Sequence, residues 1–308
     1  MDINNVIYPF TLLPNFKGKV RILRIIHQFF SKKNNKTFWT YLNKPVRYQM
    51  NINPNCGHEL MSYYMGGYEH DTVLFLDKIY DPNGYFFDIG ANVGYISIPF
   101  TLMQKNKYNN DKFVTYSFEA INSNYDSLVR NIIINGLVNN VKSFRVGLGD
   151  MEKDVIIQVE GNLKDGCGTG TANILPENSL FNCERINLKI TTLDSMVAQK
   201  IIPSNVTLMK LDTDGYDFFI LQGGKAILKN SRPLIYGEFA KICLAWHNHK
   251  IDDVVSYMKS FDYSIFFKYP NMWKFNHKYD IQKYISDLLL IPNEQIDKYK
   301  IFLINDIF

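Results

Sequence analysis

Short apolar runs alternate with amphipathic stretches along most of the chain, and this alternation is the main structural signal. Apolar runs predict strands at 85–89, 113–118, 143–146, 206–211 and 234–237. The stretches at 95–103, 123–135 and 251–261 predict helices. Alternating strands and helices are typical of an α/β protein with a doubly wound, mainly parallel sheet.

Two further pairs of segments are expected to be antiparallel. Residues 155–160 and 186–192 alternate in polarity around a Gly-rich stretch at 161–170. Residues 264–267 and 287–291 are apolar and can close the main sheet as its last two strands. The sheet then has seven strands.

The chain is expected to divide into a basic N-terminal extension (1–45), a lead-in of one strand and helices (46–83) and the α/β domain (84–308). Residues 17–33 predict a basic amphipathic helix within the extension. Two interpretations of this helix stay open. It packs on the body with its charged side solvated, or it lies on a partner or an anionic membrane, with apolar residues available to insert. Those residues are Ile22, Leu23, Ile26, Phe29 and Phe30.

Charge is unevenly distributed along the 308 residues. Residues 1–50 hold nine Lys or Arg and one acid, a local charge of +8, whereas the whole chain carries +4. The remainder therefore carries −4, which argues against a protein whose main task is to grip duplex DNA.

The amino-acid composition indicates the cellular compartment in which the protein is expected. Hydrophobic residues make up 46% and charged residues 21%, as in ordinary globular proteins. The four cysteines form no C-x-x-C pair, which excludes a zinc ribbon or thioredoxin motif and favours a reducing compartment. Neither a signal peptide nor a membrane-spanning run is recognisable. We expect a cytoplasmic protein, with peripheral membrane contact and homo-oligomerisation left open.

Four of the predicted parallel strands have an acid next to their carboxyl end: Asp88, Glu119, Asp212 and Glu238. Ligands of open α/β sheets bind outside the carboxyl ends of the strands. An acid after the first strand and another about 30 residues later are typical of nucleoside binding, because the second acid accepts hydrogen bonds from ribose hydroxyls.

The loop after the first strand reads DIGANVG (88–94) and is not G-x-G-x-x-G. A dinucleotide pyrophosphate needs the N–H groups of a helix end and no nearby carboxylate. S-adenosylmethionine has no phosphate and carries a sulfonium cation, so Asp88 favours it over NAD. The alternative is that Asp88 has a structural role, with hydrogen-bond partners supplied by the protein itself.

Five segments carry a family resemblance: FDIGANVG (87–94), SFEA (117–120), SLVRNIIINGL (127–137), TTLDS (191–195) and MKLDTDGYDFFILQGG (209–224). They resemble the FkbM family of S-adenosylmethionine-dependent methyltransferases, over most of the chain after its first 45 residues. The resemblance implies a class I (Rossmann-like) methyltransferase fold and O-methylation, often of sugars or polyketide hydroxyls. The chain departs from the family pattern at Ala120, where the family has Pro, and at Asp214 and Asp217, where it has Glu.

Position and resemblance together imply roles for ten residues. The expected catalytic residues are Asp212, Lys210 and Glu238. Lys210 and Asp212 project to the same side of their strand, so either is a candidate to orient or deprotonate an acceptor. A buried structural role stays open for each carboxylate. The expected cofactor-binding residues are Asp88, Gly90, Asn92, Gly94, Glu119, Asp150 and Glu69.

The expected reaction is O-methylation of a glycan or similar small acceptor, recognised by segments 161–185 and 240–250. N-methylation, nicotinamide-dependent oxidoreduction and non-catalytic binding of the cofactor or a glycan are the alternatives. No Asn-Pro-Pro-Tyr follows the strand at 206–211, which argues against amino-methylation of nucleic-acid bases. No nucleic-acid partner is expected. No metal-ligand cluster is recognisable, and His247 and His249 fit a surface turn better than a metal site.

Overall fold

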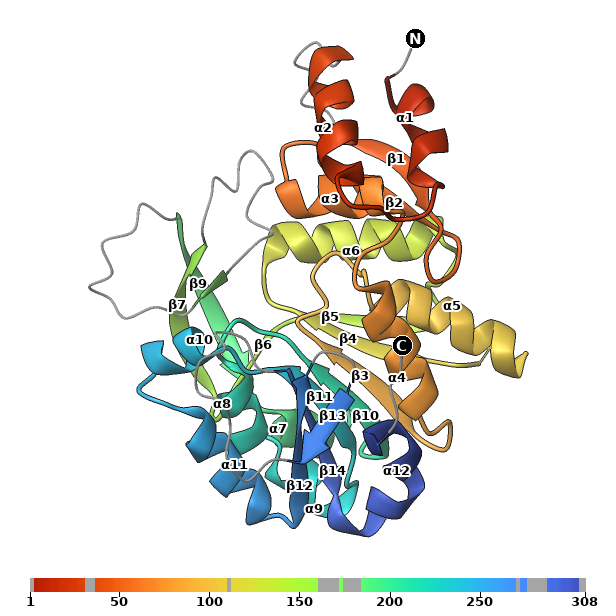
Figure 1. Ribbon diagram of the computed structural model, residues 1–308. Coiled ribbons are helices and arrows are strands. Elements are labelled where there is room, and N and C mark those ends of the chain that lie inside the picture. The colour runs from red at the N-terminus through yellow and green to blue at the C-terminus, as the bar shows by residue number, and fades with distance from the viewer. Residues whose placement is uncertain are drawn as a thin grey trace.

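The structure is a computed structural model that describes residues 3–30, 37–109, 112–159, 172–173, 184–269, 272–275 and 287–304. Its centre is a sheet of eight strands in the order β13-β12-β14-β11-β10-β3-β4-β5 (Figure 1). These are β3 (Tyr85–Ile89), β4 (Thr115–Glu119), β5 (Val141–Arg145), β10 (Val206–Leu211), β11 (Leu234–Glu238), β12 (Tyr263–Tyr269), β13 (Met272–Phe275) and β14 (Asp287–Pro292).

The sheet is mainly parallel. Strands β5, β4, β3, β10 and β11 run parallel to one another, whereas β14 is antiparallel to both β11 and β12. The predicted fold class is therefore confirmed, including the antiparallel closing pair. The seven expected strands are all present, and β13 adds an eighth at the edge.

Helices cover both faces because neighbouring strand residues point to opposite sides. Phe86 packs in one apolar cluster with three helices, and Phe87 packs in the cluster on the other face with five. The first set is α4 (His70–Ile79), α5 (Ser97–Tyr108) and α12 (Ile296–Ile304), the last preceded by the short η2 (Asn293–Gln295). The second is α7 (Leu193–Ala198), α8 (Asp217–Gln222), α9 (Lys225–Asn230), α10 (Lys241–Trp246) and α11 (Ile251–Lys259). With both faces covered, the strand ends are left for a ligand.

The N-terminal elements form a layer stacked on α6 (Asn122–Ile134) (Figure 1). They are α1 (Ile3–Thr11), α2 (Lys19–Phe30), β1 (Phe38–Leu42), β2 (Tyr48–Ile52) and α3 (Gly57–Met65). Strands β1 and β2 pair antiparallel, so the expected boundary at residue 45 falls inside a hairpin.

Two asparagines attach this layer to α6. The backbone N–H of Gln49 donates to the Asn135 side chain at 2.8 Å, and that of Asn51 donates to the Asn131 side chain at 3.0 Å. The free edge of β2 is thereby partly satisfied by a helix rather than by another strand.

A smaller sheet, in the order β6-β9-β7-β8, lies beside the main one (Figure 1). It contains β6 (Gly147–Leu148), β7 (Lys153–Val159), β8 (Ala172–Asn173) and β9 (Glu184–Thr191). The expected antiparallel pairing of its two long strands is confirmed. The Gly-rich stretch 161–170 lies outside the described residues, as does nearly all of the proposed acceptor segment 161–185. No helix in the described ranges is long and apolar enough to cross a membrane.

Candidate active site

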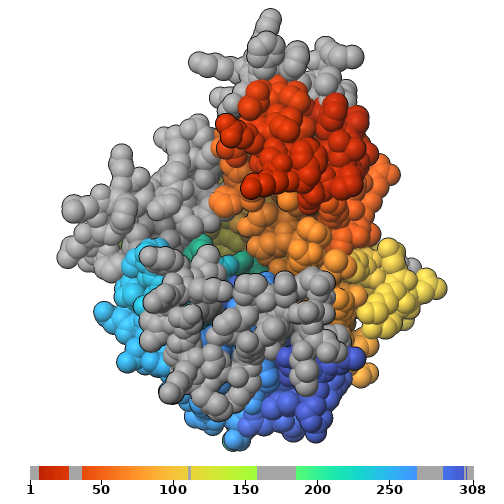
Figure 2. All heavy atoms as spheres, in the orientation of Figure 1, coloured from red at the N-terminus to blue at the C-terminus, as the bar shows by residue number. Residues whose placement is uncertain are grey.

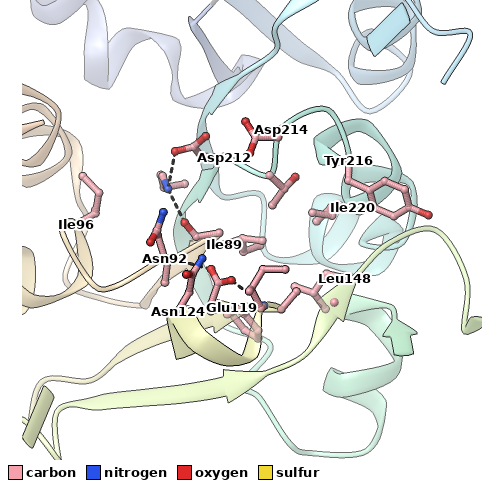
Figure 3. Close-up of a pocket in the computed structure, with 18 of the residues that line it drawn as sticks. Ile89, Asn92, Ile96, Glu119, Asn124, Leu148, Asp212, Asp214, Tyr216 and Ile220 are labelled. Carbon is pink, nitrogen blue, oxygen red and sulfur yellow. Dashed lines mark hydrogen bonds and ion pairs between the residues drawn. The ribbon is translucent and has the colours of Figure 1, made fainter. Parts of the chain in front are cut away.

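A cavity of about 560 Å³ opens at the carboxyl ends of the central strands (Figure 3). Gly90, Glu119, Asp212 and Glu238 line it, and they end or directly follow β3, β4, β10 and β11. Because ligands of open α/β sheets bind at this edge, the cavity is the candidate active site.

The loop after β3 forms the floor of the cavity. Gly90 has φ +78°, and a Cβ there would lie 1.8 Å from the carbonyl oxygen of Asp212, so only glycine fits. Asn92 is also left-handed, with φ +49°, a conformation that Asn tolerates better than most residues. Its backbone N–H donates to Glu119 at 2.9 Å, which ties the loop to the end of β4.

Glu119 is held by backbone donors on both carboxylate oxygens. Oε2 accepts from the N–H of Asn92 and Oε1 accepts from the N–H of Ile121 at 2.8 Å. Burial raises the pKa of Glu119 to about 7, although these hydrogen bonds oppose the rise. A carboxylate oxygen has two lone pairs, so Glu119 can still accept hydrogen bonds from a ligand hydroxyl.

Lys210 is almost completely buried in the wall of the cavity. Its Nζ lies 3.1 Å from Asp212 Oδ2 and 3.5 Å from Asp88 Oδ1, and it donates to the carbonyl oxygen of Gly90 at 3.1 Å. Burial disfavours the charged form, but Asp212, Asp88 and Glu69 together raise the pKa of Lys210 above its ordinary value. The neighbouring carboxylates thus favour the protonated form of Lys210, which suits the orienting role better than that of a base.

Acidic side chains gather at the Asp212 side of the cavity. Figure 3 shows Asp212 and Asp214 together on the side opposite Glu119, and Glu69 and Glu238 also line the cavity. Burial, then the charge of Asp212, raises the pKa of Glu238 to about 8. The same two causes raise the pKa of Glu69. This side favours a cation or a hydroxyl donor.

Asp88 does not line the cavity, contrary to the expected cofactor contact. It is fully buried, accepts a hydrogen bond from the Ser97 hydroxyl and faces Lys210 from behind. The strand turns this side chain toward α5, so Asp88 supports the site without reaching it.

Gly94 and Asp150, two further expected cofactor contacts, also lie outside the cavity lining. A Cβ at Gly94 would lie 2.7 Å from Ile98 and 2.9 Å from Leu128, so this glycine permits close packing of helices. Asp150 forms an ion pair of 2.9 Å with Lys153 at the turn after β6. Gly90, Asn92, Glu119 and Glu69 do line the cavity.

The turn after β10 contains both acids at which the chain departs from the family pattern, Asp214 and Asp217. Asp217 is fully buried and accepts from the N–H and hydroxyl of Thr213 at 3.0 and 2.8 Å, and from the N–H of Gly215 at 3.1 Å. It closes the turn that places Asp214, with φ +52°, at the cavity. Asp217 is therefore structural, whereas Asp214 is in reach of a ligand.

Sequence reasoning missed the apolar wall of the cavity. Ile157, Leu188 and Ile190 come from the smaller sheet, and Ile121 and Tyr216 follow strands of the main one. The alternation in 155–160 and 186–192 signalled one apolar face, without showing that it faces a cavity.

Two further lining residues, His58 and Glu59, come from α3. Burial raises the pKa of Glu59 to about 7. Nothing in the sequence around them indicated a site.

In segment 240–250, His247 ends α10 and packs edge-on against Tyr216 and Phe219, with ring centroids 5.6 and 5.4 Å away. His249 packs in the same manner on Phe218. Within the described part of the chain, no group of three or more His, Cys, Asp or Glu side chains could hold a metal ion.

Residues 88–265 match the family model described as the methyltransferase FkbM domain, which is more than half of the chain. No curated protein matches the chain.

Among solved structures, the chain is similar to a methyltransferase FkbM from Methylobacillus flagellatus at 13% identity, with a TM-score of 0.41 over 89% of this chain and 60% of that one. A tRNA (uracil-54, C5)-methyltransferase from Pyrococcus abyssi in complex with S-adenosyl-L-homocysteine has 12% identity and a TM-score of 0.39, over 83% of this chain and 44% of that one. An rRNA methylase from Streptococcus thermophilus has 10% identity and a TM-score of 0.40, over 72% and 95%.

Proposed function

The chain belongs to the FkbM methyltransferase family and has the class I, Rossmann-like methyltransferase fold, and we propose that it transfers a methyl group from S-adenosylmethionine to a hydroxyl of a glycan or similar small acceptor. One observation carries this proposal. A single cavity at the carboxyl edge of the sheet brings together the Gly90 loop, the Glu119 carboxylate and the Asp212 carboxylate.

The donor set suits this cofactor. Glu119 is positioned to accept hydrogen bonds from ribose hydroxyls, and the missing side chain at Gly90 lets the ligand approach the backbone. Six carboxylates and one lysine are among the described residues that line the cavity, so a cation is favoured there. When bound, the sulfonium supplies the methyl group. The six are Glu59, Glu69, Glu119, Asp212, Asp214 and Glu238.

Asp212 and Glu238 are the candidates to take a proton from the acceptor hydroxyl. Lys210 holds Asp212 in place through their 3.1 Å contact. Glu238, with its pKa raised to about 8, is better matched than an ordinary carboxylate to accept a proton near neutral pH. Methyl transfer is an in-line displacement, so orientation of the acceptor by these groups is a large part of catalysis.

N-methylation is the second candidate, because the same acidic side would hold a protonated amine. Mass spectrometry of the product separates the two, since an ether and an N-methylamine fragment differently. A chain that binds the cofactor but transfers nothing to any acceptor would instead be a binding module.

Calorimetric titration tests the cofactor. We expect binding of S-adenosylmethionine and of its demethylated product, and none of NADH. Glu119→Ala should weaken binding by roughly 1–3 kcal/mol, the effect of losing hydrogen bonds to an ionised partner. Asp126→Ala is the control, because it removes an exposed carboxylate on α6 that lies outside the cavity lining. Equal losses in the two variants, or binding of NADH alone, would contradict the proposal.

Mass spectrometry of cell-surface glycans, with and without the gene, tests the acceptor. Loss of a methyl ether on deletion, restored by the wild-type chain and not by Asp212→Asn, is the expected result. An unchanged glycan profile beside normal cofactor binding would overturn the acceptor and leave the cofactor proposal standing.

A further inference from the structure

Large apolar side chains are exposed at the N-terminal end of the molecule. Six of them fall between residues 10 and 25, each between 45% and 56% exposed. Figure 2 shows this red region as an outer face at the upper end of the molecule. We call it the N-terminal face, made of the end of α1, residues 12–18 and the outer side of α2. The six are Phe10, Leu12, Leu13, Phe16, Ile22 and Ile25.

The orientation of α2 is fixed by its inner side. Leu23 is buried in the core cluster of the N-terminal layer, and His27 is hydrogen-bonded to the Tyr64 hydroxyl at 2.6 Å. The helix therefore cannot rotate to hide Ile22 and Ile25 without breaking these contacts. Of the residues that the sequence offered for insertion, Leu23 is thus unavailable.

Ile26 is half-buried against the same cluster and is unavailable as well. The side chains of Phe29 and Phe30 lie outside the described residues. The apolar residues that precede α2 are exposed instead and are available for insertion.

The segment between α1 and α2 is held by a buried cation. Lys19 Nζ donates to the carbonyl oxygens of Thr11 at 2.9 Å and Leu13 at 2.6 Å, and to the Asn15 side chain at 3.3 Å. Leu12, Leu13 and Phe16 are therefore presented by an ordered segment, so their exposure is built into the fold.

The charge on this face identifies its partner. Lys17, Arg21 and Arg24 are exposed among the apolar residues, and the sequence contains no Asp or Glu from residue 3 to residue 58. Apolar residues interleaved with basic ones and free of acids match the boundary between anionic headgroups and acyl chains. A second copy would bring the same positive charge, which disfavours self-association.

We propose that the N-terminal face docks the enzyme on an anionic membrane surface, with Phe16, Ile22 and Ile25 entering the headgroup region and Arg21 and Arg24 pairing with lipid charge. Helix α3 connects the face to the candidate active site, because it packs against α1 and α2 and supplies His58 and Glu59 to the cavity. Docking itself does not depend on the proposed acceptor.

Sedimentation with vesicles tests the charge. The full-length protein should sediment with phosphatidylcholine vesicles that contain phosphatidylglycerol at low salt, much less at high salt, and not with phosphatidylcholine alone. Each arginine near such a surface contributes about a factor of five, so Arg21→Gln with Arg24→Gln should weaken binding about thirtyfold. Lys225→Gln with Lys229→Gln on α9 removes the same charge elsewhere on the surface and should have no effect.

A separate pair of substitutions tests the contribution of the apolar residues to membrane binding. Ile22→Ser with Ile25→Ser should weaken binding to the anionic vesicles about tenfold or more. Ile201→Ser with Ile301→Ser, at positions 47% and 63% exposed, is the control and should bind like wild type. All four variants change exposed residues, so unaltered thermal unfolding checks that each is folded.

Three results would overturn the proposal: no sedimentation with anionic vesicles at low salt, equal binding to neutral vesicles, or equal losses in the control variants. Conversion of a dimer to a monomer by Ile22→Ser with Ile25→Ser would also overturn it, because the face would then be a subunit interface. None of these readouts involves methyl transfer, so they stand apart from the proposed function.

Discussion

Lys210 and Asp212 lie side by side at the end of β10, with 3.1 Å between Nζ and the nearer carboxylate oxygen. The Lys210 side chain is 4% exposed, whereas that of Asp212 is 35% exposed and borders the cavity. Asp88 faces the same Nζ from the protein interior at 3.5 Å. The lysine therefore connects a buried acid of the core to an acid of the site.

Lys210→Met should destabilise the protein by about 3–5 kcal/mol, because it leaves Asp88 buried without its counter-charge. Asp88 Oδ1 has no hydrogen-bond donor among the described residues, so the Lys210 charge is its principal compensation. Urea unfolding followed by circular dichroism measures the loss.

The double variant Lys210→Met with Asp88→Asn is the control for this first prediction. Removing both charges should restore much of the lost stability. A double variant no more stable than Lys210→Met alone would show that the loss comes from packing rather than from an unpaired charge.

Asp212→Asn should lower turnover by about 10²–10⁴-fold, the usual contribution of a general base, while the affinity for S-adenosylmethionine changes little. Asn keeps the size of the side chain and an oxygen that can face Lys210. Single-turnover transfer of a labelled methyl group, beside calorimetric titration, separates the two effects. Parallel falls in affinity and turnover would make Asp212 a cofactor ligand instead. Glu238→Gln, measured in the same way, shows which of the two carboxylates takes the proton.

The strand pattern could be predicted from the sequence because it depends on local periodicity. The run at 85–89 gives β3 with the same bounds, and the run at 206–211 gives β10. Elements that depend on tertiary packing were missed. Helix α1 contains Pro9, and its stability comes from burial of residues such as Ile7 against the N-terminal layer.

The site could be predicted only as far as its strand ends. An acid at a strand end signals the edge where ligands bind, and Glu119, Asp212 and Glu238 do line the cavity. Which way each side chain points is set by register and neighbouring helices. The side chain of Asp88 turns toward Ser97 on α5. An acid at a strand end therefore indicated, in this case, a residue that supports the site without lining it.

Gly90→Ala should destabilise the protein by several kcal/mol and abolish cofactor binding. The added Cβ would lie 1.8 Å from the carbonyl oxygen of Asp212, so β3 and β10 would have to separate. Gly136→Ala is a matched control, because Gly136 also has a positive φ, of +67°, but nothing lies within 4 Å of its Cβ position. The Gly136→Ala variant should lose only about 1–2 kcal/mol of stability, the effect of placing a Cβ on a backbone with positive φ. Similar losses in both variants would contradict a close approach at Gly90.

Stability of the ligand-free protein should fall as pH rises from 5 to 8. Burial raises the pKa of Glu119 and Glu59 to about 7 and that of Glu238 to about 8, against an ordinary value of 4.5. In this window the native state therefore holds protons that the unfolded state has released, so the slope of the unfolding free energy with pH is negative. The three shifts together correspond to a loss of several kcal/mol, which urea unfolding across the range measures.

Glu238→Gln tests the origin of this slope, because glutamine copies the protonated carboxyl and cannot ionise. The variant should match wild type near pH 5, exceed it in stability at pH 8 and show a flatter pH dependence. Glu294→Gln is the control. Arg232 lowers the pKa of Glu294, so that group is ionised in both the native and unfolded states above pH 5 and adds no slope. A Glu238→Gln variant whose slope equals that of wild type would mean that the acidic side of the cavity is relieved by solvent, and the charge argument for a cationic ligand would lose its support.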